Sequence, residues 1–124
     1  MSERRTSPLW AGFAAGLLLT GIPFWRLPYT ADFWGDLPFQ LGFVGLAAAT
    51  AVLAASGAAR LWPTFWAMLA AFPAAVAIRV AVEVAEDPTD HNLWPIELVL
   101  AAIFSLIAIL PGLLVGALVR RARA

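Results

Sequence analysis

Long apolar stretches separated by short polar connections dominate the pattern along this chain. Four of them are long enough to cross a bilayer, at about 8–25, 38–57, 61–84 and 93–118. About 20 apolar residues in a helix span a hydrocarbon core of about 30 Å. Lipid offers no hydrogen-bond partners, so a spanning segment must bond its own backbone, as a helix does. The pattern predicts one all-α domain, residues 1–124, built as an up-down bundle of four transmembrane helices.

Proline marks the start of each predicted span, where the first N–H groups have no partner within the helix. These prolines are Pro8, Pro38, Pro63 and Pro95. We expect Ser7 to cap the first helix, and Asp90 or Asn92 to cap the fourth. Pro73 and Pro111 lie inside the third and fourth spans, where each removes a helical hydrogen bond and predicts a kink.

The arginines predict how the bundle is oriented. If the N-terminus is cytoplasmic, six of the eight arginines lie on the cytoplasmic side: Arg4, Arg5, Arg60, Arg120, Arg121 and Arg123. The positive-inside rule then places both termini inside, with short basic tails at 1–7 and 119–124. The Ala-rich, Lys-free composition is typical of a GC-rich bacterium. We expect a multi-pass protein of the bacterial inner membrane.

Small residues predict where the helices approach one another, because lipid provides no hydrophobic drive between helices. The first and fourth spans contain Gly12-x-x-x-Gly16 and Gly112-x-x-x-Gly116, and the second offers Gly42, Gly45, Ala49 and Ser56. A small or polar stripe follows one face of the fourth span: Glu97, Ala101, Ser105, Ala108, Gly112 and Gly116. We expect this stripe to face the interior of the bundle. The glycine pairs are also compatible with a homo-oligomer.

One polar cluster interrupts the apolar pattern, in the stretch RVAVEVAEDPTDHNLWPIE from Arg79 to Glu97. Arg79 and Glu83 are four residues apart and share a helix face. Glu97 lies one turn into the next span, which a short turn makes an antiparallel neighbour. An ionisable group in a span is costly unless it is paired. We therefore expect an Arg79–Glu97 clasp between the third and fourth spans, with Glu83 as a further partner.

The same cluster has an alternative interpretation as a site that faces outward. Its members are Arg79, Glu83, Glu86, Asp87, Asp90, His91, Asn92 and Glu97, joined in the widest version by Asp32 and Asp36. Carboxylates with one imidazole can hold a divalent cation, for which Asp87, Asp90 and His91 are weak candidates. Their spacing matches no dedicated metal motif. Asp87-Pro88-Thr89-Asp90 also has ordinary turn chemistry, and we predict no metal and no cofactor.

The connection from Arg26 to Phe39 carries the aromatic residues Tyr29, Phe33 and Trp34 between the first two spans. Aromatic residues at this level usually form the interfacial belt. The loop is also long enough to reach the acidic turn, where Arg26 could pair with an acid.

Composition limits the classes of function. The chain has no cysteine, which excludes disulfides and thiolate chemistry. Its eight arginines are too scattered for nucleic-acid binding. No ionisable residue lies near the middle of a predicted span, whereas coupled carriers usually place one there. Enzyme chemistry has little support: Ser105 lies too far along its helix to pair with His91.

These patterns favour a non-enzymatic accessory or interaction subunit in the lipid bilayer. Its outward acidic turn and loop would contact a larger membrane complex, and the Arg79–Glu97 clasp would hold the helices. The alternative is a small oligomeric channel or transporter that gathers cations at the acidic cluster. A membrane-embedded enzyme acting at the outer leaflet is a weaker third possibility.

Overall fold

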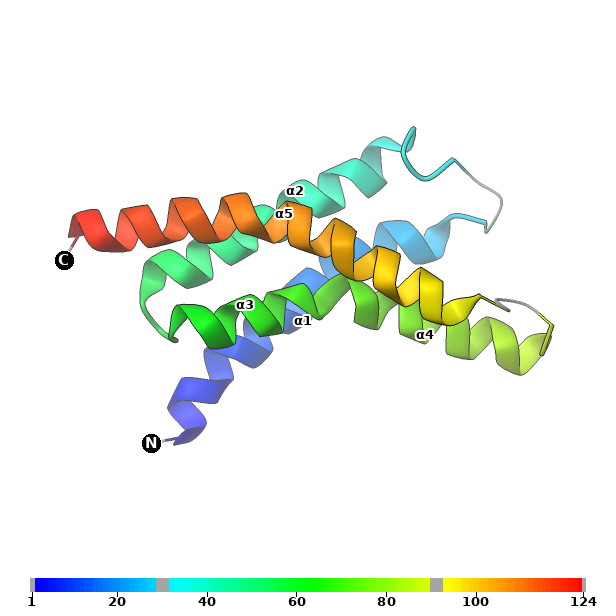
Figure 1. The fold of residues 1–124 in the computed structure, drawn as a ribbon, viewed down its shortest axis with the longest axis horizontal. Coiled ribbons are helices and arrows are strands. Elements are labelled where there is room, and N and C mark those ends of the chain that lie inside the picture. The colour runs from blue at the N-terminus through cyan, green and yellow to red at the C-terminus, as the bar shows by residue number, and fades with distance from the viewer. Residues whose placement is uncertain (1, 29–31, 90–92, 124) are drawn as a thin grey trace.

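A computed structural model describes residues 2–28, 32–89 and 93–123 of the chain. It is all-helical, with α1 at Ser2–Arg26, α2 at Leu37–Ser56, α3 at Leu61–Leu69, α4 at Ala71–Glu86 and α5 at Trp94–Arg123. The helices α3 and α4 follow each other along one path, so the chain crosses the bundle four times (Figure 1). All four crossings are long and apolar enough to span a membrane. The predicted four-helix, multi-pass architecture is confirmed at this level.

The third crossing breaks at Ala70, between α3 and α4. Pro73 has no N–H to donate to the carbonyl of Leu69, four residues earlier, and its ring crowds that carbonyl. The Ala70 N–H still bonds Trp66 O at 3.1 Å, four residues earlier, as in a regular α-helix. The kink predicted at Pro73 is confirmed. At Pro111, by contrast, α5 remains one continuous helix.

Two helix boundaries differ from the sequence prediction. α1 begins at Ser2, so Ser7 lies inside it, and the prediction that Ser7 caps the helix is wrong. Pro8 removes only the bond to residue 4, near a helix end whose carbonyls water can reach. α5 extends to Arg123, so both predicted basic tails continue neighbouring helices. The predicted caps Asp90 and Asn92 lie outside the described residues.

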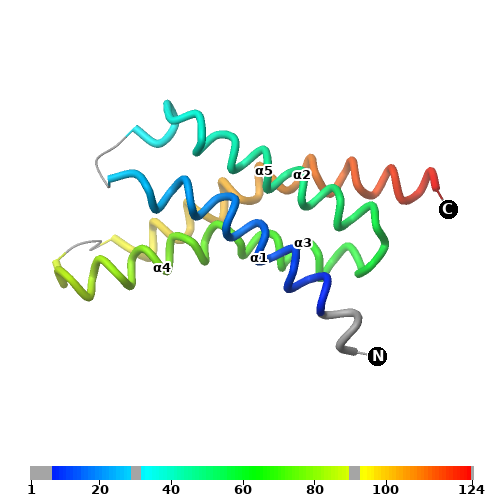
Figure 2. The backbone as a smooth tube through the Cα atoms, turned by 180° about the vertical axis from the view of Figure 1, so that it is seen from behind, coloured from blue at the N-terminus to red at the C-terminus, as the bar shows by residue number. Residues whose placement is uncertain are grey.

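α1 and α5 occupy opposite corners of the bundle. Each packs against α2 and against the α3–α4 crossing, and α5 packs most extensively on α2. Figures 1 and 2 show this arrangement from its two faces. The core has two parts, one around Phe39, Phe72 and Val76, the other around Leu46, Met68 and Ile109.

Glycine allows the closest approaches between helices. A Cβ atom on Gly42 would collide with the carbonyl oxygen of Leu19 in α1, and one on Gly112 with that of Ala47 in α2. Gly112, Gly116, Ala101 and Ser105 are all buried, which confirms the predicted inward stripe of α5 for these four residues, whereas Glu97 and Ala108 are half-buried. Both glycine pairs, including Gly12 and Gly16, pack within this one chain.

The bundle has two chemically distinct ends. We call one the acidic end: there α1 and α4 end and α2 and α5 begin, beside Asp32, Asp36, Glu83, Glu86, Asp87 and Glu97. We call the other the arginine-rich end: there α2 ends, α3 begins and α5 ends, with Arg60, Arg120, Arg121 and Arg123. The start of α1 and the end of α5 lie toward this second end (Figure 1).

Candidate functional site

Arg79 of α4 is the most deeply enclosed charge among the described residues, with only 7% of its surface exposed. Its Nε donates to Glu83 Oε1 at 2.8 Å, one helical turn further along α4. The other two guanidinium nitrogens donate to backbone carbonyls of the α1 end, to Phe24 O at 2.9 Å and Leu27 O at 2.7 Å. One side chain thus joins α4 to the last residues of α1.

These two carbonyls explain why an arginine is needed at this position. The last carbonyls of a helix lack intrahelical donors, and a cation there also complements the helix dipole. The planar guanidinium can reach two carbonyls and one carboxylate at once, which an ammonium group cannot do with the same geometry. Arg79 therefore caps α1 from a neighbouring helix.

Aromatic rings enclose the Arg79 guanidinium. Its central carbon lies 4.8 Å from the centroid of the Phe24 ring and 5.7 Å from that of Phe33. A ring face attracts a cation, more strongly where water is excluded. Nearby, the Trp25 indole N–H donates to Ala75 O at 2.9 Å, a second direct bond between α1 and α4.

From the sequence we expected Arg79 to form an interhelical ion pair mainly with Glu97. The structure confirms the Arg79–Glu83 pair and adds the end of α1 as the surface that Arg79 holds. Backbone carbonyls carry no residue-specific signal, so the sequence pattern could not reveal this partner. The Arg79–Glu97 pair stays a prediction.

A second ion pair closes the base of the connection between α1 and α2. Arg26 Nη2 lies 2.6 Å from Asp36 Oδ2, and the same oxygen accepts the Phe39 N–H at 2.9 Å as the N-cap of α2. The bond from Arg26, with that from Phe39, holds the pKa of the Asp36 carboxyl below its ordinary value. Arg26 thus pairs with an acid of its own connection, whereas we had considered a pairing with the acidic turn. The cap itself was missed, although an acid before Leu-Pro is a usable signal.

A small aromatic cavity of about 160 Å³ lies beside the Arg79 clasp. Glu97 is the acidic residue in its lining, which is otherwise apolar: Phe24, Phe33, Trp34, Phe39, Phe72, Val76, Leu100, Ala101 and Phe104. Phe33 packs inward against Phe24 and Phe39. This contradicts an interfacial belt role for Phe33, because its ring packs against the core of the bundle. Tyr29 lies outside the described residues.

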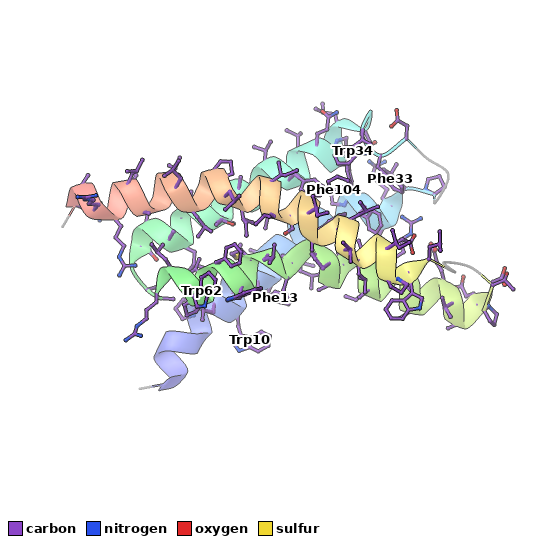
Figure 3. The ribbon with its side chains drawn as sticks, viewed as in Figure 1. Trp10, Phe13, Phe33, Trp34, Trp62 and Phe104 are labelled. Carbon is purple, nitrogen blue, oxygen red and sulfur yellow. The ribbon has the colours of Figure 1, made fainter. Side chains whose placement is uncertain are left out.

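Trp34 separates this cavity from a larger groove on the surface. Its ring contacts Phe104 of α5 edge-on, with centroids 4.6 Å apart. Figure 3 shows the two side chains next to each other. Gln40 donates from its side-chain amide to the Trp34 carbonyl and holds the loop in place. The Trp34 side chain remains 55% exposed and lines both spaces.

The larger space, which we call the α2–α5 groove, is an open apolar cleft of about 460 Å³. It is lined by Trp34, Gln40, Phe43, Val44, Ala47, Phe104, Ile107, Ala108 and Pro111. Val44 and Ile107 are each 63% exposed, whereas Ala47 and Ala108 between them are half-buried. The two exposed side chains form walls, and the two alanines form a shallow floor. Sequence reasoning did not find this groove, because its walls belong to helices far apart in the chain.

The acidic turn shows mostly local bonding where it is described. Asp87 Oδ1 accepts the backbone N–H of Thr89 at 3.1 Å and its hydroxyl at 2.7 Å, and these bonds lower the pKa of the Asp87 carboxyl. Glu86 is exposed. Asp90, His91 and Asn92 lie outside the described residues, so the weak metal site that we considered there stays untested. Within 2–28, 32–89 and 93–123, no three His, Asp or Glu side chains gather as a metal site requires.

Buried hydroxyl groups within the bundle bond to backbone carbonyls. Thr20, Thr50 and Thr64 each donate to the carbonyl four residues earlier, at 2.8 Å. Ser105 of α5 donates to Met68 O of α3 at 3.3 Å, close to the break at Ala70. These hydroxyls therefore serve helix packing.

Comparison of the chain with protein-family models, curated proteins and solved structures finds no match.

Proposed function

We propose that this protein is a non-enzymatic accessory subunit of a larger membrane complex, and that one transmembrane helix of its partner occupies the α2–α5 groove. The observation that carries the proposal is the groove itself, with exposed walls at Val44 and Ile107 and a floor of Ala47 and Ala108. Helix association in lipid depends on close van der Waals packing over small residues. A floor of alanines between larger walls is suited to receive such a helix.

Pro111 favours a helix over a lipid chain as the occupant. It has no N–H to donate to the carbonyl of Ile107, four residues earlier, and both residues line the groove. In transmembrane helices a carbonyl freed by proline is satisfied by a neighbouring helix, a hydroxyl side chain, ordered water or a local adjustment of its own helix, and a partner helix in the groove could supply either of the first two. An acyl chain has no donor to offer. We therefore expect the partner helix to place a Ser or Thr hydroxyl near the Ile107 carbonyl.

Bonds at the acidic end support the same function, because they hold in place the residues that line the groove at that end. The Arg26–Asp36 pair and the Asp36 cap hold the start of α2, and the Gln40 amide holds Trp34. A preformed groove loses little conformational entropy when it binds a partner. The contact surface we propose is thus the groove beside the loop, extending the acidic turn and loop expected from sequence.

We do not propose the alternative of a cation channel or transporter. Three of the acids that would gather cations have partners in the chain, since Glu83 bonds Arg79, Asp36 bonds Arg26 and Asp87 bonds Thr89. These contacts give the acids structural roles at the ends of helices.

Orientation forms part of the proposal. We place the arginine-rich end in the cytoplasm and the acidic end outside, in the inner membrane of a bacterium. The support is the arginine distribution, because the positive-inside rule counts Lys and Arg near the span ends. The partner would then meet the groove in the outer half of the bilayer.

To test the proposal, a bulky side chain is placed in the groove, and the amount of partner that copurifies in mild detergent is measured. Val44→Trp adds a ring to the groove wall, and Val52→Trp adds the same ring to an equally lipid-exposed site eight residues further along α2. We expect wild type and Val52→Trp to retain a stoichiometric partner, and Val44→Trp to lose most of it while keeping its thermal stability. Equal recovery from both variants, or a wild-type protein that purifies alone, would refute the docking function.

A further inference from the structure

A pocket at the arginine-rich end of the bundle has a chemistry unlike that of the α2–α5 groove. It measures about 530 Å³ and is lined by Leu9 of α1, residues Gly57 to Arg60 of the α2–α3 turn, Pro63 of α3 and Arg120 of α5. Two arginines from separate parts of the chain thus face one space, with apolar residues beside them.

Few internal contacts occupy these two arginines in the structure. Arg120 lies against Gly57 and donates to Ala59 O at 3.3 Å, a long hydrogen bond on an exposed side chain. Arg60 precedes α3 as its N-cap residue and makes no side-chain bond to the helix. By comparison, Arg79 makes three shorter bonds and is buried. The pocket arginines therefore retain donors for another molecule.

The charge around this pocket is mainly positive. The sequence has no Asp or Glu between Asp36 and Glu83, or after Glu97. Consequently α2, α3 and the C-terminal half of α5 carry no carboxylate, and Glu3 near the start of α1 is followed directly by Arg4 and Arg5. Two cations at an end with an excess of arginine over acid favour an anionic ligand.

Tryptophans place the pocket at the level of lipid headgroups. Trp10 follows Leu9 in α1, and Trp62 and Trp66 lie in α3, all three strongly exposed. Figure 3 shows Trp10 and Trp62 toward the same end of the molecule. Exposed tryptophans are enriched at the membrane interface, so Arg60 and Arg120 lie near the depth of the phosphates.

We infer that this pocket binds the headgroup of an anionic phospholipid. Arg60 and Arg120 would bond the phosphate oxygens, for which a guanidinium is well suited. An acyl chain would continue along the apolar surface near Leu9 and Pro63. Basic pockets between transmembrane helices on the cytoplasmic side bind anionic lipid headgroups in this way. The inference is independent of the partner proposed for the α2–α5 groove, which lies toward the opposite end.

The test measures lipid binding to the purified protein in detergent by native mass spectrometry, with phosphatidylglycerol as the probe. Each juxtamembrane arginine contributes about 1 kcal/mol of attraction, so Arg60→Gln or Arg120→Gln should weaken binding roughly fivefold. The double variant should weaken it by roughly 25-fold if the two contributions add. Arg123→Gln makes the same charge change outside the pocket, and we expect it to alter affinity less than about twofold.

Two further arms identify the ligand and its source. Phosphatidylcholine should bind far more weakly than phosphatidylglycerol, and inorganic phosphate should not compete at millimolar concentration. Equal loss in Arg123→Gln would show a diffuse charge effect and overturn the site. Equal binding of phosphatidylcholine would overturn the anionic headgroup, and effective competition by phosphate would overturn the lipid source. Melting temperatures of all variants without added lipid should match wild type, which excludes misfolding as the cause.

Discussion

Arginine has opposite roles at the two ends of this bundle. At the acidic end Arg79 is buried, makes three short bonds and lies over two aromatic rings. At the arginine-rich end Arg120 is exposed and makes one long bond to a backbone carbonyl. The difference teaches that the type of a charged residue in a membrane helix does not define its role. Burial and the supply of acceptors decide whether its donors are used within the fold or remain exposed.

The largest expected difference between the two ends is their accessibility from outside the cell, which labelling should report as all or none. The chain has no cysteine, so single cysteines can be introduced without a background signal. On intact cells, a membrane-impermeant maleimide should label Thr89→Cys at the acidic end but label Ala122→Cys only after lysis. Labelling of Ala122→Cys in intact cells would reverse the orientation.

Truncating an arginine should have very different effects at the two ends. Arg79→Ala removes the cation that bonds the partly buried Glu83, and it removes one donor each from Phe24 O and Leu27 O. Breaking a buried pair in this way costs about 3–5 kcal/mol of unfolding free energy. Arg120→Ala should cost less than about 0.5 kcal/mol, as for most exposed sites. Reversible unfolding in mixed detergent measures both, and similar costs would abolish the distinction between the ends.

The predicted Arg79–Glu97 pair can be tested by a double-mutant cycle. Arg79 lies over Phe24 and Phe33, which also line the cavity that contains Glu97. We expect the unfolding free energies of Arg79→Ala and Glu97→Gln to be non-additive by about 0.5–1 kcal/mol. Additive values would exclude direct contact and leave the end of α1 and Glu83 as the partners of Arg79.

The smallest expected effect concerns acid and Asp36. Because the pKa of Asp36 is lowered in the folded protein, its ionised form stabilises the fold above the ordinary carboxyl pKa of about 4. That stabilisation is lost as the pH falls through the lowered value. Asp36→Asn keeps a capping oxygen but removes the charge, so its melting temperature should lie below wild type at pH 7 and approach it as the pH falls through the lowered pKa of Asp36. A difference that stays constant over this range would argue against the ion pair.

Periodicity and composition predicted most of the fold for clear physical reasons. Span length is set by bilayer thickness, and the buried Ala101–Ser105–Gly112 stripe follows from the need for close helix approach. The kink at Pro73 follows from its missing N–H. Ser7 failed as a cap because helix formation continued through the segment before Pro8, which local preference alone does not exclude.

The candidate site was predictable only in part. Arg79 and Glu83 could be paired because they are four residues apart on one helix. The carbonyls of Phe24 and Leu27 could not, because backbone acceptors leave no trace in the side-chain pattern. The α2–α5 groove brings Val44 beside Ile107, and only the packing of α2 on α5 reveals that proximity.

Site-specific photo-crosslinking in native membranes tests the central claim most directly. A photoreactive residue would replace Val44 or Ile107 in the groove, or the lipid-exposed controls Val52 and Val115, each eight residues further along the same helix. The account predicts one partner protein crosslinked from Val44 and from Ile107, and little crosslinking from the two controls. Crosslinks to lipid alone, to a second copy of this chain, or equally from all four positions would contradict it.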